Sequence, residues 1–148
     1  MSRSIHLLII LICLCHLILL PSIRQSYRFE RFQDEAGLKA NTFYAIYQDS
    51  RGFLWFGSTS GLVRYDGYEF KLYKQAFNSD GLDSNTILSI FEDHQKILWV
   101  GTDRGLHRFN RNRERFEPFR VNDKKAIPVT SILCIFEDTE KRIWIGSE

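Results

Sequence analysis

Short apolar runs alternate with turn residues along most of the chain. In residues 42–73, four runs of apolar or alternating residues are separated by the segments DSRG, STSG and DG, each ending in glycine. Glycine permits the positive φ that tight turns between antiparallel strands require. No run in this region has the i, i+3, i+4 spacing of an amphipathic helix. The pattern predicts four antiparallel strands, at residues 42–48, 53–57, 62–65 and 68–73.

The four-strand pattern recurs at a fixed interval. Residues 37–70 and 81–114, which lie 44 positions apart, are identical at 12 of 34 positions without a gap. Unrelated segments would share about two. A third copy follows at an interval of 45, because SILCIFEDTEKRIWIGSE (131–148) matches TILSIFEDHQKILWVGTD (86–103). A period of this length suits a pair of helices or a propeller blade, and the strand pattern favours the blade.

The repeats predict both the fold class and the domain organisation. We expect an all-β protein of four-stranded antiparallel β-propeller blades, with the architecture of WD40 and kelch propellers, in an incomplete ring of about two and a half blades. The predicted segments are a signal peptide or N-terminal anchor (1–26), an N-terminal strand (27–36), propeller repeat 1 (37–80), propeller repeat 2 (81–127) and a truncated propeller repeat 3 (128–148).

The second strand of each repeat predicts the packing of the blades. FLWFG, ILWVG and RIWIG are almost continuously apolar, which indicates burial on both faces. We interpret the tryptophans as packing anchors rather than as ligand-stacking residues, and the glycine two positions later as a point of close backbone approach. Three equivalent positions on the first strand are small: Ala45, Ser89 and Cys134. Cys134 is therefore predicted to be a core residue, not a catalytic or metal-binding thiol.

The N-terminus and the charge balance predict an exported protein. Residues 5–20 are mainly apolar and follow Arg3, as in a secretory signal; an uncleaved membrane anchor is the alternative, although a span prefers about 20 residues. Loss of residues 1–26 would reduce the basic residues from 20 to 18, equal to the 18 acidic ones, which argues against a general binder of polyanions. Cys134 would be the one remaining cysteine, so no internal disulfide is expected.

The repeat motifs resemble those of the two-component regulator propeller family. A Gly-Leu opening, an Asp before the first turn, Trp-x-Gly-Ser/Thr and Gly-Leu-x-Arg-aromatic-Asp/Asn occur in this order in two copies, and the third copy departs from the pattern near Pro128. The resemblance implies a periplasmic sensor region of a Bacteroidetes hybrid two-component system, which senses a nutrient, usually an oligosaccharide. It also implies further blades, a membrane span and a histidine kinase beyond this chain, in a dimeric inner-membrane protein. The chain is then expected to be an N-terminal fragment without enzyme activity.

Two other interpretations of function remain open. A propeller enzyme, such as a lyase or glycosidase, and a protein-binding scaffold both use this type of fold. The segment YRFERF at residues 27–32 resembles RERFEPF at residues 113–119, which indicates a fourth strand. We predict that residues 27–32 close the ring of the intact protein by completing its last blade.

The sequence predicts no catalytic, cofactor-binding or metal site. His94 and His107 lack a paired ligand spacing. Asp49, Asp93 and Asp138 recur before the first turn of each repeat, and a turn-capping role fits them better than a calcium loop. The adjacent carboxylates Glu92–Asp93 and Glu137–Asp138 should point to opposite faces of a strand. The basic segment 104–125 interleaves Arg with Phe, and we interpret it as a solvated outer strand rather than a nucleic-acid surface.

Overall fold

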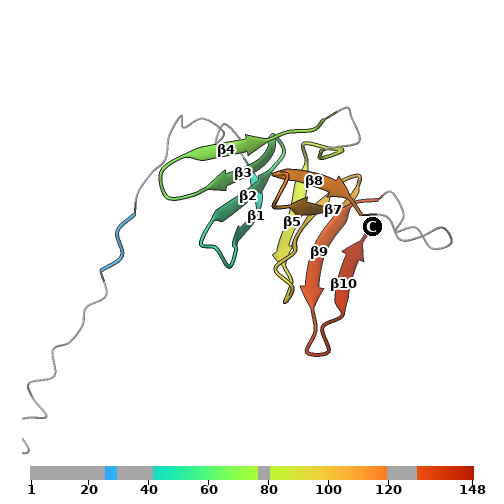
Figure 1. The fold of residues 1–148 in the computed structure, drawn as a ribbon. Helices are drawn as coiled ribbons and strands as arrows, with labels where there is room; N and C mark the ends of the chain where they lie inside the picture. The colour runs from blue at the N-terminus through green and yellow to red at the C-terminus, as the bar shows by residue number, and fades with distance from the viewer. Residues whose placement is uncertain (1–25, 30–41, 77–80, 120–129) are drawn as a thin grey trace, which may run out of the picture. The chain divides into compact units, whose positions relative to one another are not determined.

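The computed structural model describes residues 26–29, 42–76, 81–119 and 130–148. Every strand lies in the second of the two units into which the chain divides, Phe32–Glu148. The described residues form three antiparallel sheets and no helix, and therefore no helix able to cross a membrane (Figure 1). The all-β prediction is confirmed.

Two of the sheets have four strands and the third has two. The strands of the first sheet are β1 (Phe43–Gln48), β2 (Leu54–Ser58), β3 (Gly61–Tyr65) and β4 (Phe70–Tyr73). Those of the second are β5 (Ile87–Glu92), β6 (Leu98–Thr102), β7 (Gly105–Asn110) and β8 (Arg115–Pro118), and those of the third are β9 (Ile132–Glu137) and β10 (Ile143–Ser147). Neighbours in sequence are neighbours in each sheet, which is the topology of a propeller blade. The four strands predicted for residues 42–73 are thus present.

The three sheets share one register at the position of the small residues. Ala45 pairs with Gly57, and the same pairing recurs in the second and third sheets (Ser89 with Gly101, Cys134 with Gly146). The ladder is irregular close to this pairing in every sheet. Equivalent residues of successive repeats therefore occupy equivalent places.

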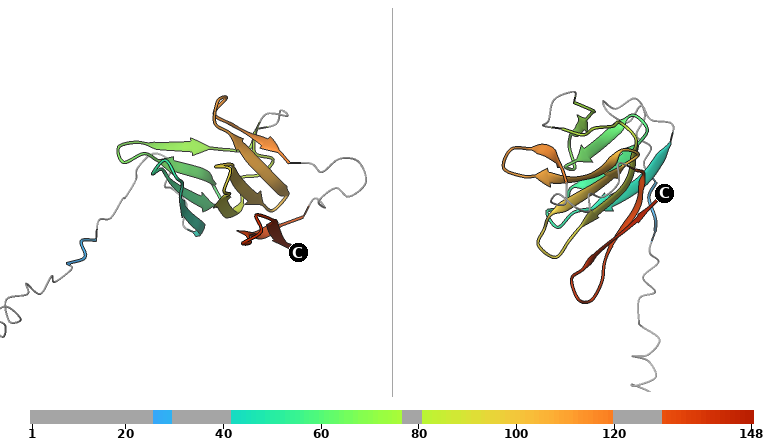
Figure 2. Two further views of the ribbon diagram at one scale, coloured as in Figure 1. Left: turned by 60° about the horizontal axis from the view of Figure 1, so that its bottom comes forward. Right: turned by 90° about the vertical axis from the view of Figure 1, so that its right-hand side faces the viewer.

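The core lies between the sheets. One cluster joins the first and second sheets and contains Trp55, Leu62, Leu82, Ile87, Ile90, Leu98, Val100, Phe109 and Phe116. A second cluster joins the second and third sheets around Trp99, Leu106 and Ile132. Val100 belongs to the first cluster and Trp99 to the second, because successive residues of β6 point to opposite faces. The views of Figure 2 show β1, β5 and β9 in succession along one side of the three sheets.

Glycine in the Trp-x-Gly motif makes the close contact between sheets possible. A Cβ atom on Gly57 would lie 2.8 Å from Cγ2 of Ile87, which belongs to the next sheet. A Cβ atom on Gly101 would lie 2.7 Å from the carbonyl oxygen of Ile132 and 2.2 Å from Oγ of Ser89. Real Cβ atoms do not approach other atoms so closely, so any larger residue would push the sheets apart. The predicted close approach is confirmed at both positions.

The third sheet differs from the prediction of a uniformly buried repeat. Trp55 and Trp99 are buried, whereas Trp144 is 56% exposed. Cys134 is exposed, so its assignment as a core residue is wrong. The reason is that Ile132 of the third sheet covers Ser89, the equivalent residue of the second sheet, while no strand of the described chain covers Cys134.

The N-terminal predictions fall largely outside the described residues. Residues 26–29 form no strand, and Tyr27 and Phe29 are exposed. The rest of the predicted closing strand, at residues 30–32, lies outside the described residues, as do residues 1–25 of the predicted signal peptide. The ring-closing role of residues 27–32 and the domain boundaries given above stay predictions.

Candidate functional site

The first turn of every repeat is built on one aspartate. Oδ1 of Asp49 accepts hydrogen bonds from the backbone N–H groups of Arg51 at 2.9 Å and Phe53 at 3.1 Å. Asp93 and Asp138 make the same two contacts two and four residues further on. These bonds satisfy the amides of the turn, as the predicted turn-capping role requires.

The other carboxylate oxygen of each aspartate accepts a hydrogen bond from tryptophan. The indole Nε1–H donates to Oδ2 in all three repeats, at 3.1 Å from Trp55 to Asp49, 2.8 Å from Trp99 to Asp93 and 2.7 Å from Trp144 to Asp138. The capping aspartate thereby fixes both the turn and the orientation of the ring that packs between sheets. Separate motifs in the sequence, Asp and Trp-x-Gly, form one structural unit.

These hydrogen bonds favour the ionised form of Asp49 and Asp138. Burial opposes ionisation of Asp49, but the indole of Trp55, the guanidinium of Arg111 and two backbone amides outweigh it and lower the pKa of the carboxyl. The indole of Trp144 and the amide of Arg142 lower the pKa of Asp138 from its ordinary value of 3.8 to about 2. The first turns of the first and third repeats therefore carry a negative charge at neutral pH.

A glutamate of the second sheet binds the first turn of the first sheet, and the equivalent glutamate of the third sheet binds the first turn of the second sheet. Oε2 of Glu92 accepts from the backbone N–H of Ser50 at 2.7 Å, and Oε1 accepts from the Ser50 hydroxyl at 3.0 Å. Oε2 of Glu137 accepts from the backbone N–H of His94 at 2.7 Å, and its Oε1 lies 2.8 Å from Nδ1 of His94. The two glutamates thus make the same contact between consecutive sheets. Each glutamate binds the turn of the preceding sheet, whereas the aspartate next to it in sequence binds the turn and the tryptophan of its own sheet.

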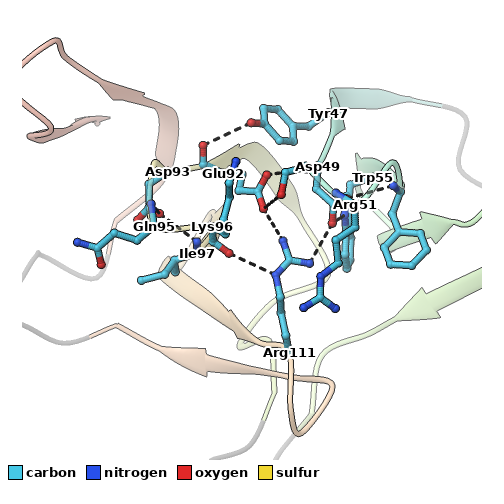
Figure 3. A network of polar contacts seen from close by, with 12 residues as sticks. Tyr47, Asp49, Arg51, Trp55, Glu92, Asp93, Gln95, Lys96, Ile97 and Arg111 are labelled. Atoms are coloured by element: carbon cyan, nitrogen blue, oxygen red, sulfur yellow. Dashed lines mark hydrogen bonds and ion pairs between the residues drawn. The ribbon is translucent and has the colours of Figure 1, made fainter.

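Arg111 connects three segments at the first of these contacts (Figure 3). Its guanidinium donates to Oδ2 of Asp49 at 3.1 Å, to Oε1 of Glu92 at 2.6 Å and to the carbonyl oxygen of Lys96 at 3.3 Å. All three charged side chains are largely buried. The planar guanidinium presents its donors in a fixed geometry to two carboxylates and a carbonyl oxygen at once, whereas a lysine ammonium is a compact charge with three donors on one nitrogen. This role could not be predicted from the repeat pattern, because position 67 of the first repeat, 44 residues earlier, holds glycine.

The turns that follow β1, β5 and β9 line an open groove of about 500 Å³. Tyr47 and Phe91 line it with half-buried rings whose centroids are 6.1 Å apart. Around the rings stand hydrogen-bonding and charged groups from three repeats, including Ser50, His94 and Lys141. The groove therefore combines two aromatic rings with a lining that is mostly polar and charged, including the carboxylates of Asp49, Glu92, Asp93, Glu137 and Asp138.

The other residues that were considered from the sequence as possible site residues have structural roles. His107 is fully buried, and its Nε2 accepts a long hydrogen bond of 3.3 Å from the backbone N–H of Asp83. Burial lowers its pKa, although the nearby carboxylate of Asp83 opposes this effect, so the ring is neutral at pH 7. In the part of the basic segment that the structure describes, Arg108 pairs with Glu117 and Arg111 with two carboxylates. Among the described residues no group of three or more His, Cys, Asp or Glu is placed to hold a metal ion.

Comparison with known proteins agrees with the repeat structure. The family model named two component regulator propeller matches residues 37–60, 81–104 and 126–148. Comparison with curated proteins gives no match. Among solved structures, the extracellular domain of BT3049 from B. thetaiotaomicron, described as a hybrid two component system, is 28% identical with a TM-score of 0.69. The match covers 81% of this chain and 18% of that chain.

A second protein from B. thetaiotaomicron gives a similar result. The extracellular domain of BT4673, also described as a hybrid two component system, is 29% identical with a TM-score of 0.65 over 82% of this chain and 17% of that one. Another structure of BT4673, described as a one component system, is 28% identical with a TM-score of 0.63, over 82% of this chain and 18% of that one. This chain thus spans less than a fifth of the length of these relatives. The chain belongs to the family of proteins built from two component regulator propeller repeats.

Proposed function

We propose that this chain is part of the periplasmic, ligand-sensing propeller of a hybrid two-component system. The observation that carries the proposal is the coincidence of three family repeats with a fold shared by the extracellular domains of two such systems. In this proposal residues 1–26 direct export. Ligand binding changes the arrangement of the blades, and a histidine kinase outside this chain receives the signal. Such coupling requires that the ligand bind two arrangements with different affinities.

The groove between the turns supports an oligosaccharide as the ligand. Tyr47 and Phe91 offer ring surface, against which the apolar face of a sugar can pack. Ser50, His94 and Lys141 offer polar groups at the rim, suited to hydroxyl groups. Residues from three consecutive repeats meet here, so a ligand in the groove would contact all three sheets and respond to their relative positions.

The test of the sensor role has two parts. A fusion of residues 1–26 to alkaline phosphatase, which is active only after export, should give activity outside the cytoplasm. In the native host, interruption of the gene should abolish the induction of polysaccharide-utilisation genes by one oligosaccharide and leave induction by the others intact. Unchanged induction by every oligosaccharide tested would exclude the nutrient-sensing role.

The test of the groove uses the whole chain and exposed side chains. Calorimetric titration against the oligosaccharide identified in the host should show weaker binding for Lys141→Ala and His94→Ala. Tyr68→Ala is the matched control, because Tyr68 is exposed and does not line the groove. Equal affinity of all variants would place the ligand elsewhere. A propeller enzyme, the alternative, would instead cleave the oligosaccharide during the titration.

A further inference from the structure

The second repeat differs from the first at a buried histidine and at the residue that lies beside it. His107 stands where the first repeat has Val63, and Asp83 stands where it has Lys39. In the folded chain the two residues meet: Nε2 of His107 lies 3.3 Å from the backbone nitrogen of Asp83 and 3.3 Å from its Oδ1. Two departures from the repeat, far apart in the sequence, therefore form one contact.

The ring of His107 is enclosed and has a single charged neighbour. The residue is fully buried, and its cross-strand partners on β6 and β8, Val100 and Pro118, are apolar. Burial lowers the pKa of the ring, and Asp83, the only charged residue of the described chain that acts on it, raises the pKa. Nδ1 is buried and forms no hydrogen bond with a described residue. The polar contacts of the ring are therefore made at Nε2 alone.

Nε2 can bond to only one of the two groups of Asp83 at a time. In a neutral ring whose proton is on Nδ1, Nε2 accepts the backbone N–H of Asp83. A protonated ring carries a hydrogen on Nε2, so it cannot accept that N–H and can donate to Oδ1 instead. The hydroxyl of Thr102 on β6 already holds Oδ1 at 3.0 Å. Because the carboxylate is held in place, the backbone N–H of Asp83 is the group that has to move.

Asp83 lies in the segment 81–86, which leads from the first sheet to the second. Leu82 is fully buried in the core cluster between these two sheets. Ile87, the next residue after the segment, packs against Gly57 of the first sheet, where an added Cβ atom would lie 2.8 Å from its Cγ2. Movement of the segment therefore acts directly on the packing between the first and second sheets.

We propose that His107 is a proton-operated switch of the segment 81–86. At neutral pH the ring accepts the backbone N–H of Asp83 and holds the segment against the second sheet. When the ring takes up a proton, it exchanges this bond for one to the Asp83 carboxylate, the backbone of Asp83 moves away, and the packing of Leu82 loosens. Acid thus weakens the contact between the first two sheets at one place while the sheets themselves stay folded. The switch uses residues of these two repeats only and does not depend on the sensor role.

The first experiment follows the full chain by NMR between about pH 7.5 and about pH 4.5. The ring protons of His107 should titrate with a midpoint below 6.5, and the backbone amide of Asp83 should shift with the same midpoint. At a pH about one unit below the midpoint, hydrogen exchange of the Asp83 amide, corrected for its intrinsic rate, should be about tenfold faster or more. The amide of Ala76, which donates to the carbonyl oxygen of Leu82, should follow it. The amide of Gly52, bonded within the first turn of the first sheet, is the control and should keep its protection.

Three variants test the roles of the two residues. His107→Val, which copies the first repeat, should give an Asp83 amide whose shift and exchange no longer follow the pH. Asp83→Asn keeps the backbone N–H but removes the charge that favours the protonated ring, so the midpoint of His107 should move to lower pH. His94→Ala removes a partly exposed histidine at another turn and should leave the midpoint and the exchange of Asp83 unchanged.

Four results would overturn the switch. Exchange at Asp83 that stays constant while His107 titrates means that the ring takes up its proton without moving the segment. Loss of protection at Gly52 together with Asp83 means that acid unfolds the chain as a whole. An unchanged midpoint in Asp83→Asn means that the carboxylate is not the partner of the protonated ring. A ring that stays neutral down to about pH 4.5 means that no switch operates in this range.

Discussion

The indole nitrogen of Trp99 donates a hydrogen bond to Oδ2 of Asp93 at 2.8 Å, while Oδ1 of the same carboxylate holds the turn amides of Gln95 and Ile97. Both side chains are buried between the second and third sheets. A single carboxylate thus links the turn chemistry of the repeat to its packing. Because the same arrangement recurs in all three repeats, its contribution to stability can be compared between buried and exposed copies.

We predict that Trp99→Phe lowers the free energy of unfolding by about 1–3 kcal/mol, because a buried carboxylate oxygen loses its hydrogen-bond donor. Trp144→Phe is the matched control. It removes the same hydrogen bond in the third repeat, where the tryptophan is 56% exposed and water can replace the indole. Urea unfolding followed by circular dichroism measures both. Equal losses in the two variants would contradict the role of burial.

Among the charged residues that the structure describes, Arg111 should be the one whose substitution lowers the free energy of unfolding most. Arg111→Ala leaves the buried carboxylates of Asp49 and Glu92 facing each other without their shared cation, and we expect a loss of about 3 kcal/mol in the free energy of unfolding. Arg108→Ala breaks an exposed pair with Glu117 and should cost less than about 1 kcal/mol. In a double-mutant cycle, Arg111→Ala and Glu92→Gln should be strongly non-additive. Additive effects would mean that the ion pair contributes little.

Gly101→Ala tests the close approach of consecutive sheets. The new methyl group would lie 2.7 Å from the carbonyl oxygen of Ile132, which cannot rotate away. We expect a loss of about 1–3 kcal/mol in unfolding free energy. At Gly146 the methyl group would meet only Sγ of Cys134, a side chain that can turn aside, so Gly146→Ala should cost less. The opposite order would show that the second and third sheets pack more loosely than described.

His107 should make stability depend on pH. Burial lowers its pKa in the folded chain below the ordinary value of 6.5, so the unfolded chain binds the proton more readily. The free energy of unfolding therefore has its full value above the ordinary histidine pKa of 6.5 and decreases as the pH falls below it. Urea unfolding between about pH 7 and about pH 5 should show this fall. His107→Val, which copies Val63 of the first repeat, should remove it. A proton NMR titration of His107 with a midpoint at or above 6.5 would contradict the assignment.

The strands and the turn caps could be predicted because their causes are local. Alternating residues, glycines at turns and an aspartate two to four residues before free amides act within a few positions of the chain. The 44-residue period indicated that four such strands form one propeller blade. The Trp-x-Gly glycines and the small residues of the first strand indicated close packing. The family resemblance rested on the same motifs, and the comparisons confirm it.

The rest required the tertiary structure, because it depends on residues that come together from distant parts of the chain. Arg111 binds Asp49, which lies 62 positions earlier in the chain, and it has no counterpart in the first repeat. No periodic pattern in the sequence therefore predicts this contact. Cys134 has the same sequence context as Ser89, yet it is exposed, since burial depends on the neighbouring sheet and not on the residue's own strand. The sequence alone determined the unit that repeats. Only the packing of one unit on the next decided which side chains are buried, which charges are paired and which faces stay open.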